Sequence, residues 1–230
     1  MPASNRTLLT RVRERLRYGL AAQEAIDRLG RVGIVYCPYY VVSEGPHRGA
    51  EPAAPTGATF ATLSENQAGL IAGMAGAPLS REYVVEQMGH AVCCGVFVDA
   101  ELAGYSWASF DAVRAPVTNA ALFALDERGA YLFDMYVARA HRGERLAPWL
   151  RYRMYQQLVD GGRDRIYSMT LANNHSSRRF KARLGAIEIE KRVVWGIKSV
   201  ALRDARIRAL TPDPLPSPSS MRFRGPQRRA

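Results

Sequence analysis

The chain has 230 residues, of which 47% are hydrophobic and 9% aromatic, and a net charge of +11. This composition is typical of a globular protein and excludes a disordered chain, and the length suits one domain with appendages. No apolar run approaches the length of a membrane span, and residues 1–20 lack the hydrophobic core of a signal peptide, so we expect a cytoplasmic protein.

The first predicted element is an amphipathic helix over residues 7–29, with apolar residues on one face and arginines on the other. Gly30 is expected to end it. We expect this helix to dock onto the rest of the protein, with weak contact to a membrane surface as the alternative. Residues 31–43 follow as a strand, but Pro38 disfavours a place in the middle of a sheet.

The next elements follow an exposed connection rich in Gly, Pro and Ala. They are a strand over 58–63, a helix over 66–75, a helix capped by Ser80 that runs to about Gly89, and two strands within 91–110 that turn at 99–101. Residues 120–127 suit either a helix or a strand.

The stretch 131–147 joins a predicted buried strand to a helix that begins at Leu146. A helix N-terminus presents unpaired N–H groups and a partial positive charge, and together these bind phosphate. Gly143 and Ala147 are small enough to let the backbone approach an anion. The sequence therefore predicts an anion site in the turn 142–147.

This turn resembles the phosphate-binding signature of the GNAT superfamily of N-acetyltransferases, [Gln/Arg]-x-x-Gly-x-[Gly/Ala]. Here the six positions are Arg142, Gly143, Glu144, Arg145, Leu146 and Ala147, with Arg145 where the family usually has glycine. A second stretch, 174–186, is similar to the family's later helix, which starts with Asn and ends with Leu-Gly. The predicted elements also follow in the family's order: helix 146–160, strand 165–172 and helix 175–184.

The resemblance implies a mixed α/β (α+β) fold in which helices flank a central sheet that splays apart beside the phosphate-binding turn. We therefore predict an N-terminal helix–strand extension with a linker over 1–57, an acyl-CoA-binding catalytic domain over 58–210 and a basic, disordered tail over 211–230. Within the catalytic domain, residues 187–197 alternate as a strand, and 200–210 could form a closing helix.

The resemblance also implies that acetyl-CoA, or another acyl-CoA, lies in the splay with its pantetheine arm along strand 131–137. A backbone N–H of that strand would stabilise the oxyanion of the reaction. Eleven basic residues against three acidic ones between Arg139 and Arg183 suit a ligand with several phosphates. The implied cofactor-binding residues are Met135, Val137, the six residues of the turn, Asn174 and Ser177.

Acyl transfer to an amine needs a base, because an ammonium cannot attack a thioester. Strand alternation predicts Leu132, Asp134 and Tyr136 on one face. Asp134 is an acid inside an otherwise apolar strand, which makes it a candidate general base, with a structural role beside an arginine as the alternative. Tyr136 is the substitute, acting through a chain of water molecules.

In many family members a tyrosine seven residues after the asparagine protonates the departing thiolate, and here that position is Lys181. Helical spacing groups Lys181 with Asn174, so we expect it to face the cofactor rather than the core. It would then stabilise or protonate the thiolate, or only add positive charge near the phosphates while Tyr136 or Tyr167 reaches the sulfur.

These features predict an acyltransferase that moves an acetyl or other acyl group from acyl-CoA to a primary amine of a small molecule or peptide, by direct attack in a ternary complex. Two alternatives stay open: a non-catalytic acyl-CoA sensor or adaptor, and a tRNA-dependent aminoacyl transferase of related fold. Nucleic acid is disfavoured as a partner because the sequence shows no aromatic and basic stacking platform. No metal is expected, because the four histidines show no metal-ligand spacing with Cys37, Cys93 and Cys94.

Overall fold

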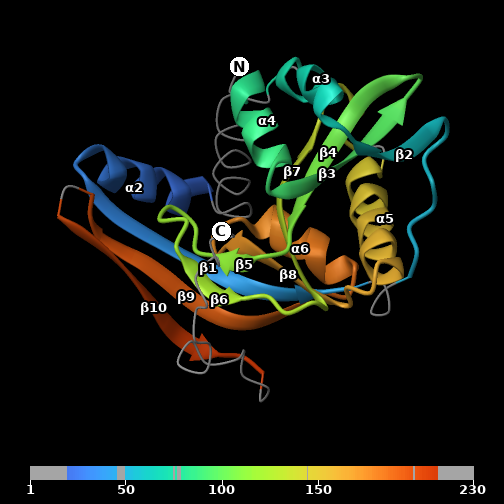
Figure 1. Ribbon diagram of the computed structural model, residues 1–230. Helices are drawn as coiled ribbons and strands as arrows, with labels where there is room; N and C mark the ends of the chain where they lie inside the picture. Colours follow the sequence, from blue (N-terminus) through green and yellow to red (C-terminus); the bar gives the residue numbers. More distant parts are fainter. Residues whose placement is uncertain are drawn as a thin grey trace, which may run out of the picture.

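The computed structural model describes residues 20–45, 50–74, 76, 79–143, 145–198 and 200–211, which form a large sheet flanked by helices (Figure 1). In chain order the elements are α2 (Leu20–Arg31), β1 (Ile34–Glu44), β2 (Ala58–Leu63), η2 (Glu65–Gln67), α3 (Ala68–Ala72), α4 (Arg81–Met88), β3 (Ala91–Val98), β4 (Glu101–Ser109), β5 (Ala112–Arg114), β6 (Ala121–Ala124), β7 (Gly129–Val137), η3 (Arg139–His141), α5 (Leu146–Asp160), β8 (Arg165–Leu171), α6 (His175–Arg183), β9 (Ile187–Ile197) and β10 (Ala201–Ala209).

The main sheet is mixed and has the strand order β10-β9-β1-β8-β7-β4-β3-β2. All neighbours are antiparallel except β7 and β8, which pair in parallel only from Gly129–Arg165 to Leu132–Ser168. Beyond that point the two strands separate and divide the sheet into two wings (Figure 1). The predicted mixed sheet with a splay beside the strand 131–137 is therefore confirmed.

Helices cover the two faces of the β2–β7 wing with separate apolar clusters. Leu150 and Met154 of α5 pack on one face with Leu132, while Ile71 of α3 and Val84 of α4 pack on the other. The helix 146–160 has the predicted bounds because two glycines follow it, and Gly162 takes the φ of +82° that ends the helical backbone. This packing fixes β7 and the start of α5 relative to each other.

The strand β1 lies in the middle of the sheet, between β9 and β8, so the expectation that Pro38 would exclude it from a central place is wrong. The reason lies in the register. Pairing of β1 with β8 begins at Tyr39, and the carbonyl of Pro38 accepts from the N–H of Ala172, just after β8 has ended. The proline nitrogen therefore faces a position where β8 offers no ladder hydrogen bond.

Other expectations about secondary structure also need correction. Residues 201–209 form the edge strand β10, not a closing helix, because they pair along β9. The segment 121–124, which the sequence left undecided, is a strand that pairs with β5. The helix α2 continues through Gly30 to Arg31, while residues 1–19 and 212–230 lie outside the described residues. In the described part of the chain, no helix combines the length and apolar character needed to cross a bilayer.

Candidate active site

A basic cleft lies where β7 ends and α5 begins. Its volume is about 650 Å³, and its wall combines Val137, residues 142–143 and 145–147 of the turn, and one side of α6. The arginines that line it are Arg142, Arg145, Arg179 and Arg183. The first amides of α5 have no partner within the helix. Because Pro148 has no N–H, the N–H groups available to an anion are those of the residues before Pro148. This geometry fits the predicted phosphate site.

The turn has a left-handed backbone at two of its residues. Gly143 has φ +97°, and Arg145, the N-cap of α5, has φ +63°. Arg145 therefore adopts the conformation for which glycine is preferred, at a cost of roughly 1–2 kcal/mol. The sequence departs from the signature at this position, although Arg145 has the positive φ that glycine adopts most readily. Glu144 lies outside the described residues.

Replacing Gly143 with valine is expected to weaken acetyl-CoA binding at least about tenfold, because a β-branched residue cannot keep φ near +97°. A Cβ at Gly143 would meet no atom within 4 Å, so the effect would come from backbone strain and from filling the cleft rather than from a clash. Calorimetric titration checks this, with Gly162→Val as the control because Gly162 also has positive φ and an open surrounding. Equal weakening in both variants would contradict a specific role for Gly143.

Arg142 connects the turn to the end of β7. Its Nε donates to the carbonyl of Val137 at 3.3 Å, and its guanidinium lies 5.6 Å from the ring centre of Tyr136. Val137 is one of the residues that we expected along pantetheine, and its carbonyl has the Arg142 side chain as a partner in this structure. The side chain of Val137 still lines the cleft, while Met135 packs toward α5.

Helix α6 presents a different face to the cleft from the one expected. Asn174 caps α6 by accepting from the N–H of Ser177 at 3.0 Å, and neither residue lines the cleft. The side that does so carries Ser176, Arg179 and Phe180. The expectation that Lys181 faces away from the core is wrong, because its relative exposure is 4%.

Lys181 belongs to a buried charged network between the sheet, α5 and α6. Its Nζ donates to Ser168 Oγ at 2.6 Å and to the Met169 carbonyl at 2.8 Å, and lies 3.4 Å from Glu44 Oε1. Glu44 also accepts from Ser168 and from Tyr155 of α5. Burial lowers the pKa of Lys181 to about 8, although Glu44 opposes that shift.

The network contains two cations for one carboxylate. Arg151 Nε lies 3.5 Å from Glu44 Oε2, and within the described part of the chain Arg151 Nε and Nη1 have no hydrogen-bond acceptor. Burial by itself would raise the pKa of Glu44, but Arg151, Lys181 and the two hydroxyl donors lower it to about 2. Glu44 is therefore ionised and compensates one of the two buried positive charges. Sequence analysis missed this network, since its members are far apart in the chain.

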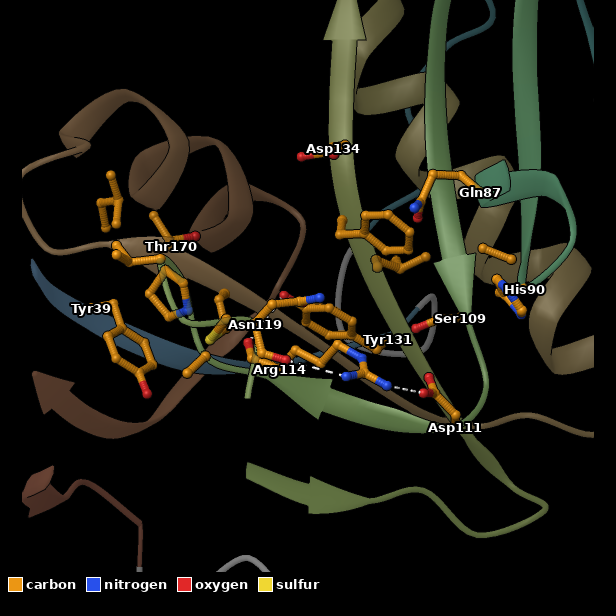
Figure 2. Close-up of a pocket in the computed structure, with 18 of the residues that line it drawn as sticks. Tyr39, Gln87, His90, Ser109, Asp111, Arg114, Asn119, Tyr131, Asp134 and Thr170 are labelled. Carbon is orange, nitrogen blue, oxygen red and sulfur yellow. Dashed lines mark hydrogen bonds and ion pairs between the residues drawn. The ribbon is translucent and has the colours of Figure 1, made fainter. Parts of the chain in front are cut away.

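A second cavity, of about 840 Å³, opens at the splay on the other side of β7 (Figure 2). Residues 131–134 of β7 and 169–171 of β8 form its inner wall. Its polar lining residues are Tyr39, Tyr83, Glu86, Gln87, His90, Ser109, Asp111, Arg114, Asn119, Asp134 and Thr170. Arg114 pairs with Asp111 and donates to the Asn119 carbonyl at 3.2 Å. Its charge is thus compensated, while Glu86 and Asp134 add negative charge.

Asp134 enters this cavity because β7 is bulged at that point. Tyr105 pairs with Tyr136 and Trp107 with Phe133, so two residues of β7 oppose one of β4. The predicted alternation is therefore wrong: Leu132 packs toward α5, while Phe133 and Tyr136 pack toward α3 and α4. Asp134 has φ +42° and a partly exposed side chain that points away from β7 on the side of α6 (Figure 2).

The surroundings of Asp134 suit a base. Partial burial raises the pKa of its carboxyl, and the same carboxylate raises the pKa of Tyr83, together with Glu86 and after the larger effect of burial. Tyr83 thus lies within electrostatic range of both carboxylates that line the cavity, Asp134 and Glu86. Tyr83 and Glu86 were missed in the sequence, although their i, i+3 spacing on the helix capped by Ser80 places them on one face.

The two tyrosines considered as substitutes lie elsewhere. Tyr136 stacks on Tyr105 with ring centres 6.0 Å apart, and its hydroxyl lies beside Gly76. Tyr167 packs edge-on against Phe123 at 5.3 Å. The structure therefore brings Asp134 to the cavity at the splay and Lys181 to the buried network, and it does not gather Asp134, Tyr136 and Lys181 at one point. The described residues contain no group of three or more His, Cys, Asp or Glu that could hold a metal ion.

The chain thus combines a splayed mixed sheet, a basic cleft at the end of one splayed strand and a cavity with two uncompensated carboxylates near the middle of that strand. The model of the acetyltransferase (GNAT) family matches residues 53–186, more than half of the chain, and the chain belongs to this family. No curated protein matches the sequence.

Solved structures show the same fold at low sequence identity. A tandem GNAT protein from the clavulanic acid biosynthesis pathway is 19% identical with a TM-score of 0.53, over 77% of this chain and 57% of that one. A GCN5-related N-acetyltransferase from Sphaerobacter thermophilus is 14% identical with a TM-score of 0.52, over 81% and 57%. A GNAT-family acetyltransferase from Colwellia psychrerythraea is 14% identical with a TM-score of 0.50, over 71% and 57%. The matches thus span little more than half of each of those chains.

Proposed function

We propose that the protein transfers an acetyl or other acyl group from acyl-CoA to an amine, by direct attack within a ternary complex. The observation that carries the proposal is the separation of β7 from β8 after Leu132. As a result, the basic cleft lies at the end of β7, and the cavity that Asp134 lines lies beside the middle of the same strand. From Asp134 to Val137 is about 10 Å along a strand, a distance that a pantetheine arm can cover.

Different residues would bind the phosphates, stabilise the oxyanion and accept the proton. The turn 142–147 and the arginines of α6 would bind the phosphates. The edge of β7 beyond Leu132, which does not pair with β8, would offer an N–H to the oxyanion. Asp134 would take a proton from the ammonium, whose nitrogen then bonds to the acyl carbon while the carbon–sulfur bond breaks. The departing thiolate takes up a proton and leaves as CoA thiol.

The proposed source of the thiolate's proton is Lys181. Lys181 lies against β8 at Ser168, the last residue paired with β7, and so lies close to the start of the splay. Because its pKa is lowered to about 8, it could lose a proton near neutral pH more easily than an ordinary lysine. A positive Lys181 would also stabilise the thiolate electrostatically.

The acceptor cavity favours a cationic amine. Its lining includes Glu86, Asp111 and Asp134 against the single arginine Arg114, which Asp111 already compensates. Carboxylates in a partly enclosed cavity attract a cation and hold its amino group near the base. Polyamines, aminoglycosides and lysine side chains of peptides share this chemistry.

A screen of such amines with acetyl-CoA and the purified full chain tests the proposal, with release of CoA thiol as the readout. We expect thiol release that depends on both protein and amine. Acetyl-CoA binding without release for any amine would favour the sensor or adaptor, and release of an aminoacyl group from charged tRNA would favour the tRNA-dependent transferase. Either result would contradict the proposed activity.

A further inference from the structure

The turn between α2 and β1 and the hairpin between β9 and β10 meet at one projecting end of the molecule, at the left of Figure 1. The N–H of Lys198 donates to the carbonyl of Gly33 at 2.9 Å, which joins the two turns. We call this end the tip and define it by residues 29–36, 195–198 and 200–203.

The tip exposes large apolar side chains in an ordered arrangement. Val32 and Val200 are 71% and 79% exposed, more than any other large hydrophobic residue in the described part of the chain. The strand pairs Ile34–Ile197 and Tyr36–Trp195 continue from them on one face, and these four side chains are 42–49% exposed. Aliphatic residues therefore lie at the extremity, and a Tyr–Trp pair lies one row further in.

The charge of the tip has one sign. Segments 29–36 and 195–203 contain Arg31, Lys198 and Arg203 and no acidic residue. All three side chains are exposed, and the Arg203 guanidinium lies 5.9 Å from the Trp195 ring centre. The acids of β9 and β10 nearest to this end, Glu190 and Asp204, are bonded to Arg192.

We propose that the tip binds the surface of an anionic lipid bilayer, with its aliphatic residues entering the interface. Aliphatic side chains at the deepest point, Trp and Tyr at the level of the headgroups and cations against anionic lipids are the arrangement that bilayer interfaces favour. A single nucleic-acid strand would use the two rings but give the aliphatic side chains no role. A second copy meeting the same tip would bring like charges together. No tip residue lines the basic cleft or the acceptor cavity, so this contact would leave both accessible.

Vesicle flotation of the full chain tests the proposal, with phosphatidylcholine vesicles that either contain or lack about one-third phosphatidylserine. We expect binding to the anionic vesicles that falls as salt rises, since salt screens exposed charges. Trp195 gives a second readout because Trp107 and Trp149 are buried. Its fluorescence should shift to shorter wavelength on anionic vesicles, and the shift should be lost in Trp195→Phe.

The variant Val32→Asp/Val200→Asp should lower the partition coefficient at least about tenfold, because it places two charges at the point of entry. Both side chains are exposed, so the fold and the acyltransfer activity in solution should not change. Leu70→Asp is the matched control, because the Leu70 side chain is exposed and α3 lies at another part of the molecule. This variant should bind vesicles as the wild type does.

Equal binding of the double variant and the wild type would overturn the proposal, as would absence of wild-type binding to anionic vesicles. Trp195-dependent binding of oligouridylate without vesicle binding would replace the bilayer with single-stranded nucleic acid. Self-association that Val200→Asp abolishes, again without vesicle binding, would replace it with a second copy of the chain.

Discussion

Replacing Asp134 with asparagine is expected to lower the turnover of the acyl transfer by about two to four orders of magnitude, with acetyl-CoA affinity nearly unchanged. Asparagine keeps the size of the side chain and tolerates the left-handed φ of +42°. The loss would therefore come from the missing base and not from a rearranged bulge. Steady-state kinetics together with calorimetry separate the two effects.

Asp99→Asn is the matched control, because Asp99 also has a positive φ and lies in the exposed turn between β3 and β4. The pH profile gives an independent check. Since partial burial raises the pKa of Asp134, the acidic limb of kcat/KM should lie above the ordinary pKa of an aspartate and disappear in the variant. Unchanged turnover with a lower melting temperature would instead make Asp134 a structural residue.

The variant Glu44→Gln is expected to lower the free energy of unfolding by about 3–5 kcal/mol, because it leaves Arg151 and Lys181 buried without a carboxylate. Chemical denaturation measures the change. Removing one of the two cations as well, in Glu44→Gln/Lys181→Met, should recover part of it. No recovery would mean that the loss comes from the hydroxyl hydrogen bonds and not from charge.

Glu188→Gln is the matched control for Glu44. Glu188 pairs with Arg178 at 2.6 Å, but both side chains are about 30% exposed, so its loss should cost at most about 1 kcal/mol. The pH dependence also has a defined sign. The pKa of Glu44 falls from 4.5 to about 2 on folding, so its stabilisation is present above pH 4.5 and is lost as the pH falls toward 2. The difference in free energy of unfolding between the wild type and Glu44→Gln should therefore shrink as the pH falls from 4.5 toward 2.

Local features of the fold could be predicted from the sequence. The glycines after α5, the cap at Ser80 and the apolar strand before the phosphate-binding turn are signals carried by neighbouring residues. The helix start at Leu146 and the small residues of the turn that line the basic cleft could be predicted for the same reason, since both are visible in a short stretch, and anion binding there stays a prediction. The left-handed φ of Arg145, in contrast, could not be predicted, because non-glycine residues rarely adopt it.

Features that depend on distant parts of the chain could not be predicted. The bulge at Asp134 follows from pairing with β4, and it moves Leu132 and Tyr136 to opposite faces. The place of β1 depends on where β8 ends, and the burial of Lys181 depends on Glu44. Periodicity within one element contains none of this information.

Calorimetric titration of the full chain with acetyl-CoA tests the central claim most directly, comparing the wild type with Ala147→Glu. Ala147 lines the basic cleft in the first turn of α5, so a carboxylate there would add bulk and repel the pyrophosphate. We predict binding by the wild type, at least about tenfold weaker binding by Ala147→Glu, and wild-type affinity for Ala25→Glu on exposed α2. Equal affinity of the wild type and Ala147→Glu, or no binding by the wild type, would contradict the account.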